Sequence, residues 1–184
     1  MTDLYEENYW KDRGSLEDKH YWQVHAWLYY LEVERGLTIK TAFDWGCGRG
    51  EYVHALRSSG VDAEGFDISK TAVEQAFGQA KGHTSNNYPS GKWDFILCYD
   101  LLEHLNSSEI TTTLRDLRKA TNRTALYSIC MAGDANFERD STHVTKRTRS
   151  WWENELTKAG FKVIPTPDYF PFKHQLILTE VENK

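Results

Sequence analysis

The sequence has few cysteines, and their number is odd. Cys47, Cys98 and Cys130 are the three in 184 residues, and each lies within or beside an apolar run. Small secreted domains that depend on disulfides carry more cysteines, usually in even numbers. The sequence therefore argues against a disulfide framework and predicts three buried thiols in a reducing compartment.

Long apolar runs are also lacking. No stretch approaches the roughly 20 residues of a membrane-spanning helix. The chain does not open with a charged segment followed by an apolar core, as a secretory signal would. We therefore expect a cytoplasmic protein without a membrane span.

Positive charge is in deficit. Lys and Arg number 22 against 27 Asp and Glu, which gives a formal net charge of −5. Affinity for nucleic acid depends on clustered basic residues, so this balance disfavours a nucleic-acid partner. One basic run, residues 146–149, is more typical of a solvated start of a helix than of a contact to a charged substrate.

Glycine is concentrated where one apolar run ends. The stretch TAFDWGCGRGEY, residues 41–52, places Gly46, Gly48 and Gly50 directly after Asp44. Glycine permits positive φ and a close approach of a ligand to the backbone. The helix that follows would direct unpaired N–H groups toward such a ligand. The pattern predicts a strand, a nucleotide-binding turn and a helix.

Two other nucleotide fingerprints are missing. The dinucleotide pattern G-x-G-x-x-G would need a glycine where Glu51 stands, and a Walker loop would need Gly-Lys-Ser/Thr. Asp44 would repel a pyrophosphate but could attract an amino-acid ammonium. The segment D-x-G-x-G-x-G resembles motif I of the class I S-adenosylmethionine (SAM)-dependent methyltransferases. The resemblance implies that the loop, Cys47 included, underlies the amino-acid part of SAM and that Asp44 helps to hold its amino group.

A second acid closes the next predicted strand. Residues 61–67 alternate in polarity and end at Asp67, 17 residues after Gly50. This is near the spacing of about 20 expected for a carboxylate that accepts both ribose hydroxyls. We therefore assign Asp67 to the ribose and Ile68 to the adenine face. The alternative for Asp67 is a helix N-cap, which Ser69 supplies more naturally.

The run WDFILCY, residues 93–99, is typical of a central parallel strand. It leads into YDLLEHL, which resembles the segment after strand four in many class I methyltransferases. This resemblance assigns Tyr99 and Asp100 to the cofactor. The family usually has an acid for the adenine amino group, whereas residues 81–92 show no clear third strand and offer Asn86 instead.

Methyl transfer to a hydroxyl needs alignment and often removal of a proton. His104 and His143 are candidate bases because a neutral imidazole titrates near pH 7, and Glu103 adjoins them; we assign these three to catalysis. Together with Asp100 they could instead bind a divalent ion. That set is similar to the metal site of small-RNA 3′-terminal 2′-O-methyltransferases, where E-x-x-E-H is joined by a later histidine. Because E-H-L also occurs in metal-free relatives, we expect no metal.

The fold expected from the pattern and the resemblance is a single α/β domain. It has a Rossmann-like, seven-stranded, mainly parallel sheet of order 3-2-1-4-5-7-6 with helices on both faces. An aromatic-rich N-terminal helical cover (1–38), with helices at 4–10 and 17–34, precedes the core (39–184). The H-V…W…GF segment, residues 143–161, is similar to one that closes many glycan-type and polyketide-type methyltransferases.

These expectations define a SAM-dependent methyltransferase that acts on a hydroxyl of a small molecule or a glycan. Two alternatives stay open. A metal-assisted RNA ribose 2′-O-methyltransferase would depend on a divalent ion, and a catalytically inactive SAM-binding partner protein would have a sealed acceptor pocket.

Overall fold

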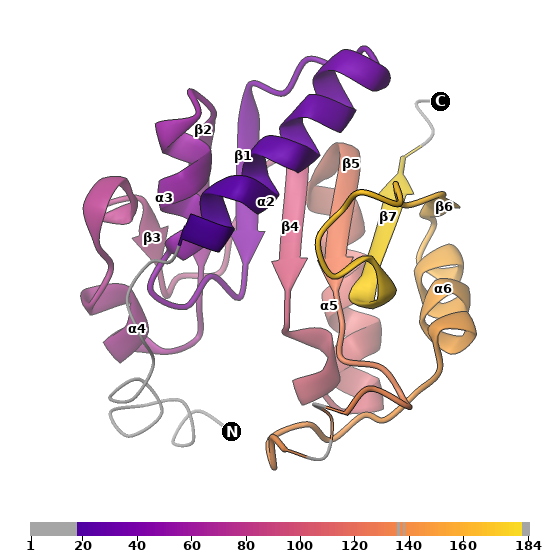
Figure 1. Cartoon of the computed structure of the whole chain (residues 1–184). Coiled ribbons are helices and arrows are strands. Elements are labelled where there is room, and N and C mark those ends of the chain that lie inside the picture. Colours follow the sequence, from indigo (N-terminus) through magenta and orange to yellow (C-terminus); the bar gives the residue numbers. More distant parts are fainter. Residues whose placement is uncertain (1–17, 136, 138, 182–184) are drawn as a thin grey trace. The chain divides into compact units, whose positions relative to one another are not determined.

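The computed structural model describes residues 18–135, 137 and 139–181. The chain divides into two compact units, residues 1–90 and 91–184, coloured indigo to magenta and pink to yellow (Figure 1). The helix predicted at 4–10 lies outside the described residues. Within the described part of the chain, no helix has both the length and the apolar character needed to cross a membrane.

The strands follow the order β3-β2-β1-β4-β5-β7-β6 in a seven-stranded sheet. Neighbours within each unit are parallel except for β7, which runs antiparallel to both β5 and β6. The predicted Rossmann-like order and the closing antiparallel strand are confirmed.

The first unit alternates strands with short helices. Its described elements are α2 (Asp18–Leu28), the π-helical η2 (Tyr29–Glu34), β1 (Thr41–Trp45), α3 (Glu51–Ser58), β2 (Asp62–Phe66), α4 (Lys70–Glu74), η3 (Gly78–Ala80) and β3 (Thr84–Ser85). The parallel register pairs Asp44 of β1 with Gly65 of β2. The glycine loop and Asp67 therefore follow neighbouring strands at the same edge.

The N-terminal helix α2 packs against α3. Val24 and Trp27 are buried, and the Tyr52 hydroxyl donates a hydrogen bond to Gln23 Oε1 at 2.8 Å. His54 Nδ1 accepts the Gln79 N–H at 2.8 Å, so its Nε2 carries the proton and donates to the Tyr21 hydroxyl, also at 2.8 Å. The described part of the predicted cover is thus tied to the helix that follows the glycine loop.

The sequence predicts one helix over residues 69–79, and the structure shows a shorter one. Ser69 caps it as expected, because its side chain accepts the Ala72 N–H. The helix nevertheless ends at Glu74, and a 3₁₀ turn begins at Gly78, whose φ is +53°. A Cβ at Gly78 would lie 2.7 Å from the His54 ring, so close packing against α3 interrupts the helical pattern. This bend leads into the two-residue strand β3, which the sequence did not reveal.

The second unit is built around a strand whose centre is fully buried. Its described elements are β4 (Trp93–Tyr99), η4 (Leu102–His104), α5 (Ser107–Ala120), β5 (Thr121–Ser128), α6 (Arg149–Lys158), β6 (Lys162–Ile164), η5 (Lys173–Gln175) and β7 (Leu176–Glu180). The four central residues of β4, Phe95 to Cys98, have no exposed surface, and neither do Leu126 and Tyr127 of β5. Continuous apolar character is what a parallel strand covered on both faces requires.

Asn106 fixes the start of α5 through a capping box. Its side chain accepts the N–H groups of Ser108 and Glu109, and the Glu109 carboxylate accepts the Asn106 N–H at 2.8 Å. We expect Asn106→Ala to lower the free energy of unfolding by about 1 kcal/mol, the usual cost of losing such a cap. Urea denaturation measures this. Thr112→Ala, at an exposed position of the same helix, is the control, and an equal effect of both variants would contradict the assignment of the cap.

Candidate active site

The glycine loop is folded back onto the end of β2. Gly46, Gly48 and Gly50 all have positive φ, at +87°, +53° and +82°. The N–H groups of Gly46 and Cys47 both donate to the Phe66 carbonyl, at 2.8 and 2.9 Å. Such φ values favour glycine, so the three glycines allow the loop to turn from β1 into α3.

Asp67 holds this loop from the neighbouring strand. Its Oδ2 accepts the Gly48 N–H at 2.8 Å, and its Oδ1 accepts the Ser69 N–H at 2.8 Å. A carboxylate has about four acceptor positions, so both oxygens can accept further bonds from a ligand. Asp67 therefore combines a structural contact with the capacity to bind a diol.

Asp44 is a buried acid at the end of β1. Only 1% of its surface is exposed, and its buried Oδ1 has no hydrogen-bond partner among the described residues. Burial, followed by the charges of Glu51 and Asp67, raises the pKa of Asp44 well above its ordinary value. A cation beside it would reverse this shift, since an opposite charge favours the ionised form. An ammonium group would therefore satisfy Asp44, whereas a phosphate would add a further negative charge.

Cys47 is a packing residue of the loop. Burial, then the neighbouring carboxylates, raises the pKa of its thiol well above its ordinary value, which excludes a thiolate nucleophile. A Cβ at Gly65 would lie 2.8 Å from Cys47 Cβ and Sγ. Gly65 thus packs against the glycine loop, which the sequence analysis missed; the signal was a glycine inside a strand, which indicates a close approach.

The residues assigned to the adenine lie on the surface of the first unit. Ile68 is 55% exposed, and Asn86 is also exposed. Close to Asn86 in the sequence, Tyr88 stacks edge-on with Trp45 and Phe66, with ring centroids 5.4 and 5.5 Å away. The aromatic rings were not predicted as a group. The adenine contacts of Ile68 and Asn86 stay predictions.

In the second unit, Asp100 makes the turn that ends β4. Its φ is +51°, which is unusual for a residue other than glycine. The Ser128 hydroxyl donates to Asp100 Oδ1 at 2.5 Å, and the Asp100 N–H donates to the Ser128 carbonyl at 3.0 Å. These bonds to the end of β5 stabilise the turn. The cofactor roles of Asp100 and of half-buried Tyr99 stay predictions.

Glu103 is completely buried in the turn η4. Its Oε1 accepts the Cys130 N–H at 2.7 Å, whereas Oε2 has no partner among the described residues. Burial, reinforced by the charge of Asp100, raises the pKa of Glu103 from 4.5 to about 8. Its carbonyl accepts the N–H groups of Val144 and Thr145, at 2.9 and 3.0 Å. Glu103 therefore anchors the segment that carries His143.

His104 and His143 lie side by side although 39 positions separate them in the sequence. Their ring centroids are 4.7 Å apart. His104 Nδ1 contacts the Thr142 hydroxyl at 2.9 Å and the Thr142 carbonyl at 3.2 Å. His143 Nε2 lies 3.9 Å from Asp140 Oδ2. The structure thus brings together the three residues assigned to catalysis. It adds contacts of Asp140 and Thr142, which lie next to His143 in the sequence but carry no motif that assigned them a role.

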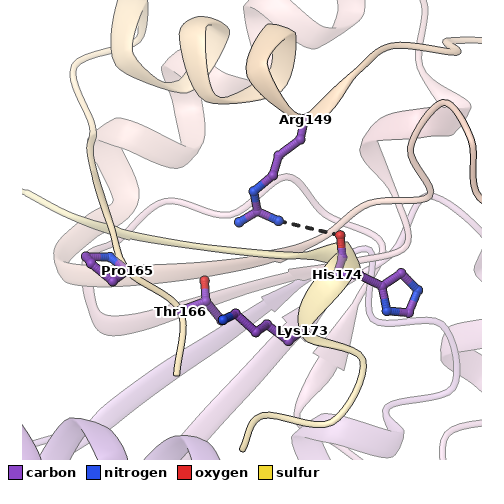
Figure 2. A pocket seen from close by; sticks show the side chains of 5 residues that line it. All are labelled: Arg149, Pro165, Thr166, Lys173 and His174. Atoms are coloured by element: carbon purple, nitrogen blue, oxygen red, sulfur yellow. Dashed lines mark hydrogen bonds between the residues drawn. The ribbon is translucent and has the colours of Figure 1, made fainter. Parts of the chain in front are cut away.

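A separate pocket of about 610 Å³ lies beside the connection between β6 and β7. Figure 2 shows the five residues that line it: Arg149, Pro165, Thr166, Lys173 and His174. Its three basic side chains each have an acidic neighbour: Glu153 for Arg149, Asp168 for Lys173 and Asp134 for His174. Because these charges are balanced, the pocket does not define an anion site.

The strand order and the glycine loop define an α/β nucleotide-binding protein. A family model described as "Methyltransferase domain" matches residues 34–166. The chain belongs to this methyltransferase family, and it is a class I SAM-dependent methyltransferase.

Individual relatives agree with this assignment. The chain is 28% identical over 109 residues to a "Ubiquinone biosynthesis O-methyltransferase" of Methylococcus capsulatus, a match that spans 53% of this chain and 46% of that protein. Two solved structures share the fold. Magnesium protoporphyrin IX methyltransferase of Synechocystis with bound SAM has a TM-score of 0.71 at 18% identity, covering 98% of this chain and 95% of that chain. A SAM-dependent methyltransferase of Clostridium acetobutylicum has a TM-score of 0.72 at 12% identity, covering 98% and 97%.

Gly48 provides a test of the loop. Valine at a φ of +53° is strained by about 1–2 kcal/mol, and its side chain would stand where backbone and cofactor meet. We expect Gly48→Val to lower affinity for S-adenosylhomocysteine (SAH) at least about tenfold, a difference of 1.4 kcal/mol, in isothermal calorimetry. Gly82→Val is the matched control, since Gly82 has a φ of +82° with open space around it. Equal affinities of the two variants would show that Gly48 does not contact the cofactor.

The raised pKa of Glu103 predicts how the free energy of unfolding depends on pH. Its pKa in the folded protein lies above its ordinary value, so the folded state binds the proton more tightly. Its favourable contribution is therefore complete below about pH 4.5 and is lost as the pH rises to about 8. We expect the free energy of unfolding of the wild type, relative to Glu103→Gln, to fall between pH 5 and 8.

Urea denaturation in a chelating buffer at four pH values measures this difference. Glu64→Gln, which removes an exposed carboxylate from β2, controls for the loss of one acid. Parallel pH profiles of the wild type and Glu103→Gln would contradict the shifted pKa.

Proposed function

We propose that the enzyme transfers the methyl group of SAM to a hydroxyl oxygen of a small-molecule or glycan acceptor. The observation that carries this proposal is the group of Glu103 and His104, which follow β4, with His143 from the segment after β5. A hydroxyl is a poor nucleophile until its proton is removed, and this group combines one carboxyl with two imidazoles. The O-methyltransferase of ubiquinone biosynthesis supports an oxygen acceptor and a small molecule.

The reaction is a displacement at carbon. An oxygen electron pair of the acceptor forms the new bond to the methyl carbon, and the bond from carbon to sulfur breaks with its electron pair on sulfur, which yields SAH. The hydroxyl proton leaves through the Glu103, His104 and His143 group. The protein's main contribution is then alignment together with proton removal.

In this proposal SAM is held chiefly by two acids of the first unit. Asp44 faces the ammonium, and Asp67 accepts the ribose hydroxyls while it holds Gly48. Asp100, Tyr99, Ile68 and Asn86 remain further candidates for cofactor contacts. The proposal also includes a single domain in which residues 1–38 cover a core of residues 39–184. It includes a cytoplasmic location, which the three buried cysteine thiols support.

Asp67 tests the cofactor site. Asp67→Ala removes a charged acceptor, so we expect SAH binding to weaken by roughly 1.5–3 kcal/mol in calorimetry, the usual worth of hydrogen bonds to charged groups. Asp62→Asn is the control, because Asp62 is an exposed acid of β2, the strand that Asp67 follows. Unchanged affinity of Asp67→Ala would remove Asp67 from the ribose site.

His143 tests the acceptor side. With SAM labelled on the methyl group, candidate acceptors with phenolic, carboxylic and sugar hydroxyls are screened alongside short RNA. On the best acceptor we expect His143→Ala to lower turnover by about 10²–10⁴-fold and to leave SAH affinity nearly unchanged.

The exposed His83 provides the matched control, His83→Ala. Full activity of His143→Ala would exclude a catalytic role. If RNA is the acceptor that is methylated and no small molecule is, the proposed acceptor class is wrong. SAH binding with no transfer to any acceptor would favour an inactive SAM-binding partner.

A further inference from the structure

The three side chains of the proposed catalytic group offer a set of metal ligands. One ligand atom from each of Glu103, His104 and His143 lies within 4.8 Å of the other two. Glu103 has no exposed surface, His104 is 7% exposed, and the His143 side chain is 8% exposed. Such burial of one carboxyl and two imidazoles is costly unless a partner satisfies their polar atoms.

Two polar atoms of this group have no such partner within the described residues. These are Glu103 Oε2 and His143 Nδ1, and both are buried. The other oxygen of Glu103 is held by the Cys130 N–H, so the side chain is fixed with Oε2 in place. A buried carboxylate oxygen and a buried imidazole nitrogen, each without a partner among the described residues, point to a bound group that accepts electron pairs, such as a metal ion.

The surroundings orient both imidazoles. Thr142 contacts His104 through Nδ1, and Asp140 faces His143 from the Nε2 side. The Thr142 hydroxyl in turn donates a hydrogen bond to Asp140. Carboxylates and other acceptors beside the second ring nitrogen are the usual outer partners of histidines that bind metals.

The segment that carries His143 is tied to η4. The N–H groups of Val144 and Thr145 donate to the Glu103 carbonyl, and the Thr145 hydroxyl donates to the Leu105 carbonyl at 2.6 Å. The backbone therefore presents the two histidines and the glutamate together. Tetrahedral ligands at 2.0–2.1 Å from one ion are about 3.4 Å apart, so ligand atoms up to 4.8 Å apart would need to close by up to about 1.4 Å.

We propose that Glu103, His104 and His143 bind one divalent transition metal ion of the Zn²⁺ type. Two imidazoles and one carboxylate suit Zn²⁺, Fe²⁺ or Co²⁺, whereas Mg²⁺ prefers oxygen ligands alone. Asp100 does not belong to the set, because it is turned to Ser128.

This inference deepens the proposed function and rests on it. Three protein ligands leave a coordination position open, where an acceptor hydroxyl can bind and lose its proton to solvent more easily. The ion, rather than an imidazole, then prepares the oxygen for transfer. The acceptor would carry an oxygen that binds such an ion.

The test is calorimetric titration of the metal-stripped full chain with Zn²⁺. We expect one equivalent to bind. Loss of an outer partner of a ligand costs about 10–100-fold in metal affinity, so loss of a direct ligand in His143→Ala or Glu103→Gln should cost at least about 100-fold. Asp140→Asn should weaken it about 10–100-fold. His83→Ala, which removes an exposed histidine elsewhere, should bind as the wild type does.

Co²⁺ gives a second, spectroscopic test. Visible absorption bands of a four- or five-coordinate ion should appear in the wild type and disappear in His143→Ala. This variant changes a residue of a loop, so it remains decisive if Glu103→Gln does not fold, and circular dichroism checks both.

Absence of Zn²⁺ binding by the wild type would overturn the inference, and so would equal affinity of the wild type and His143→Ala. Tight Mg²⁺ binding that competes with Zn²⁺ would contradict the assigned ligand chemistry. SAH titrations on the same samples separate the two proposals: SAH binding without Zn²⁺ binding rejects only the metal, whereas failure to bind SAH rejects the proposed function.

Discussion

The proposed cofactor site depends on the two hydrogen bonds that the Asp67 carboxylate accepts from the backbone. By accepting the Gly48 N–H and the Ser69 N–H, this carboxylate joins the turn after β1 to the start of the helix after β2. Gly48 can only meet it there because its φ is positive. One charged group thus stabilises the glycine loop, and in the proposed function the same side chain also accepts the ribose hydroxyls.

Each unit contains one buried acid with an oxygen that has no partner among the described residues, Asp44 in the first and Glu103 in the second. In both, burial raises the pKa of the carboxyl group. Such groups are unfavourable in a folded protein unless a ligand compensates them. Asp44 suits an organic cation, whereas Glu103, with two imidazoles beside it, suits proton removal or a metal ion. In the proposed function, Asp44 serves the cofactor and Glu103 serves the acceptor.

The fold, the family and the position of Asp67 could be predicted from the sequence, because each depends on a pattern of neighbouring residues. The apolar run of β4 and the glycine pattern after β1 are continuous in the chain, and they gave the fold, the family and Asp67. The two-residue strand β3 and the early end of α4 were not predicted, because they depend on the close packing of Gly78 against His54. The contact of Gly65 with Cys47 was not predicted for the same reason. Asp140 lies only three residues before His143, but it belongs to no motif that would have assigned it a role. The roles of the site residues, and the union of the two units in one domain, stay predictions.

The measurement that tests the central claim most directly is a crystal structure of the protein with SAH. The account predicts that the SAH ammonium lies within hydrogen-bond distance of Asp44 Oδ1 and that both ribose hydroxyls donate to Asp67, with the Asp67 contact to Gly48 retained. SAH bound elsewhere, or bound while Asp44 Oδ1 stays without a partner, would contradict it.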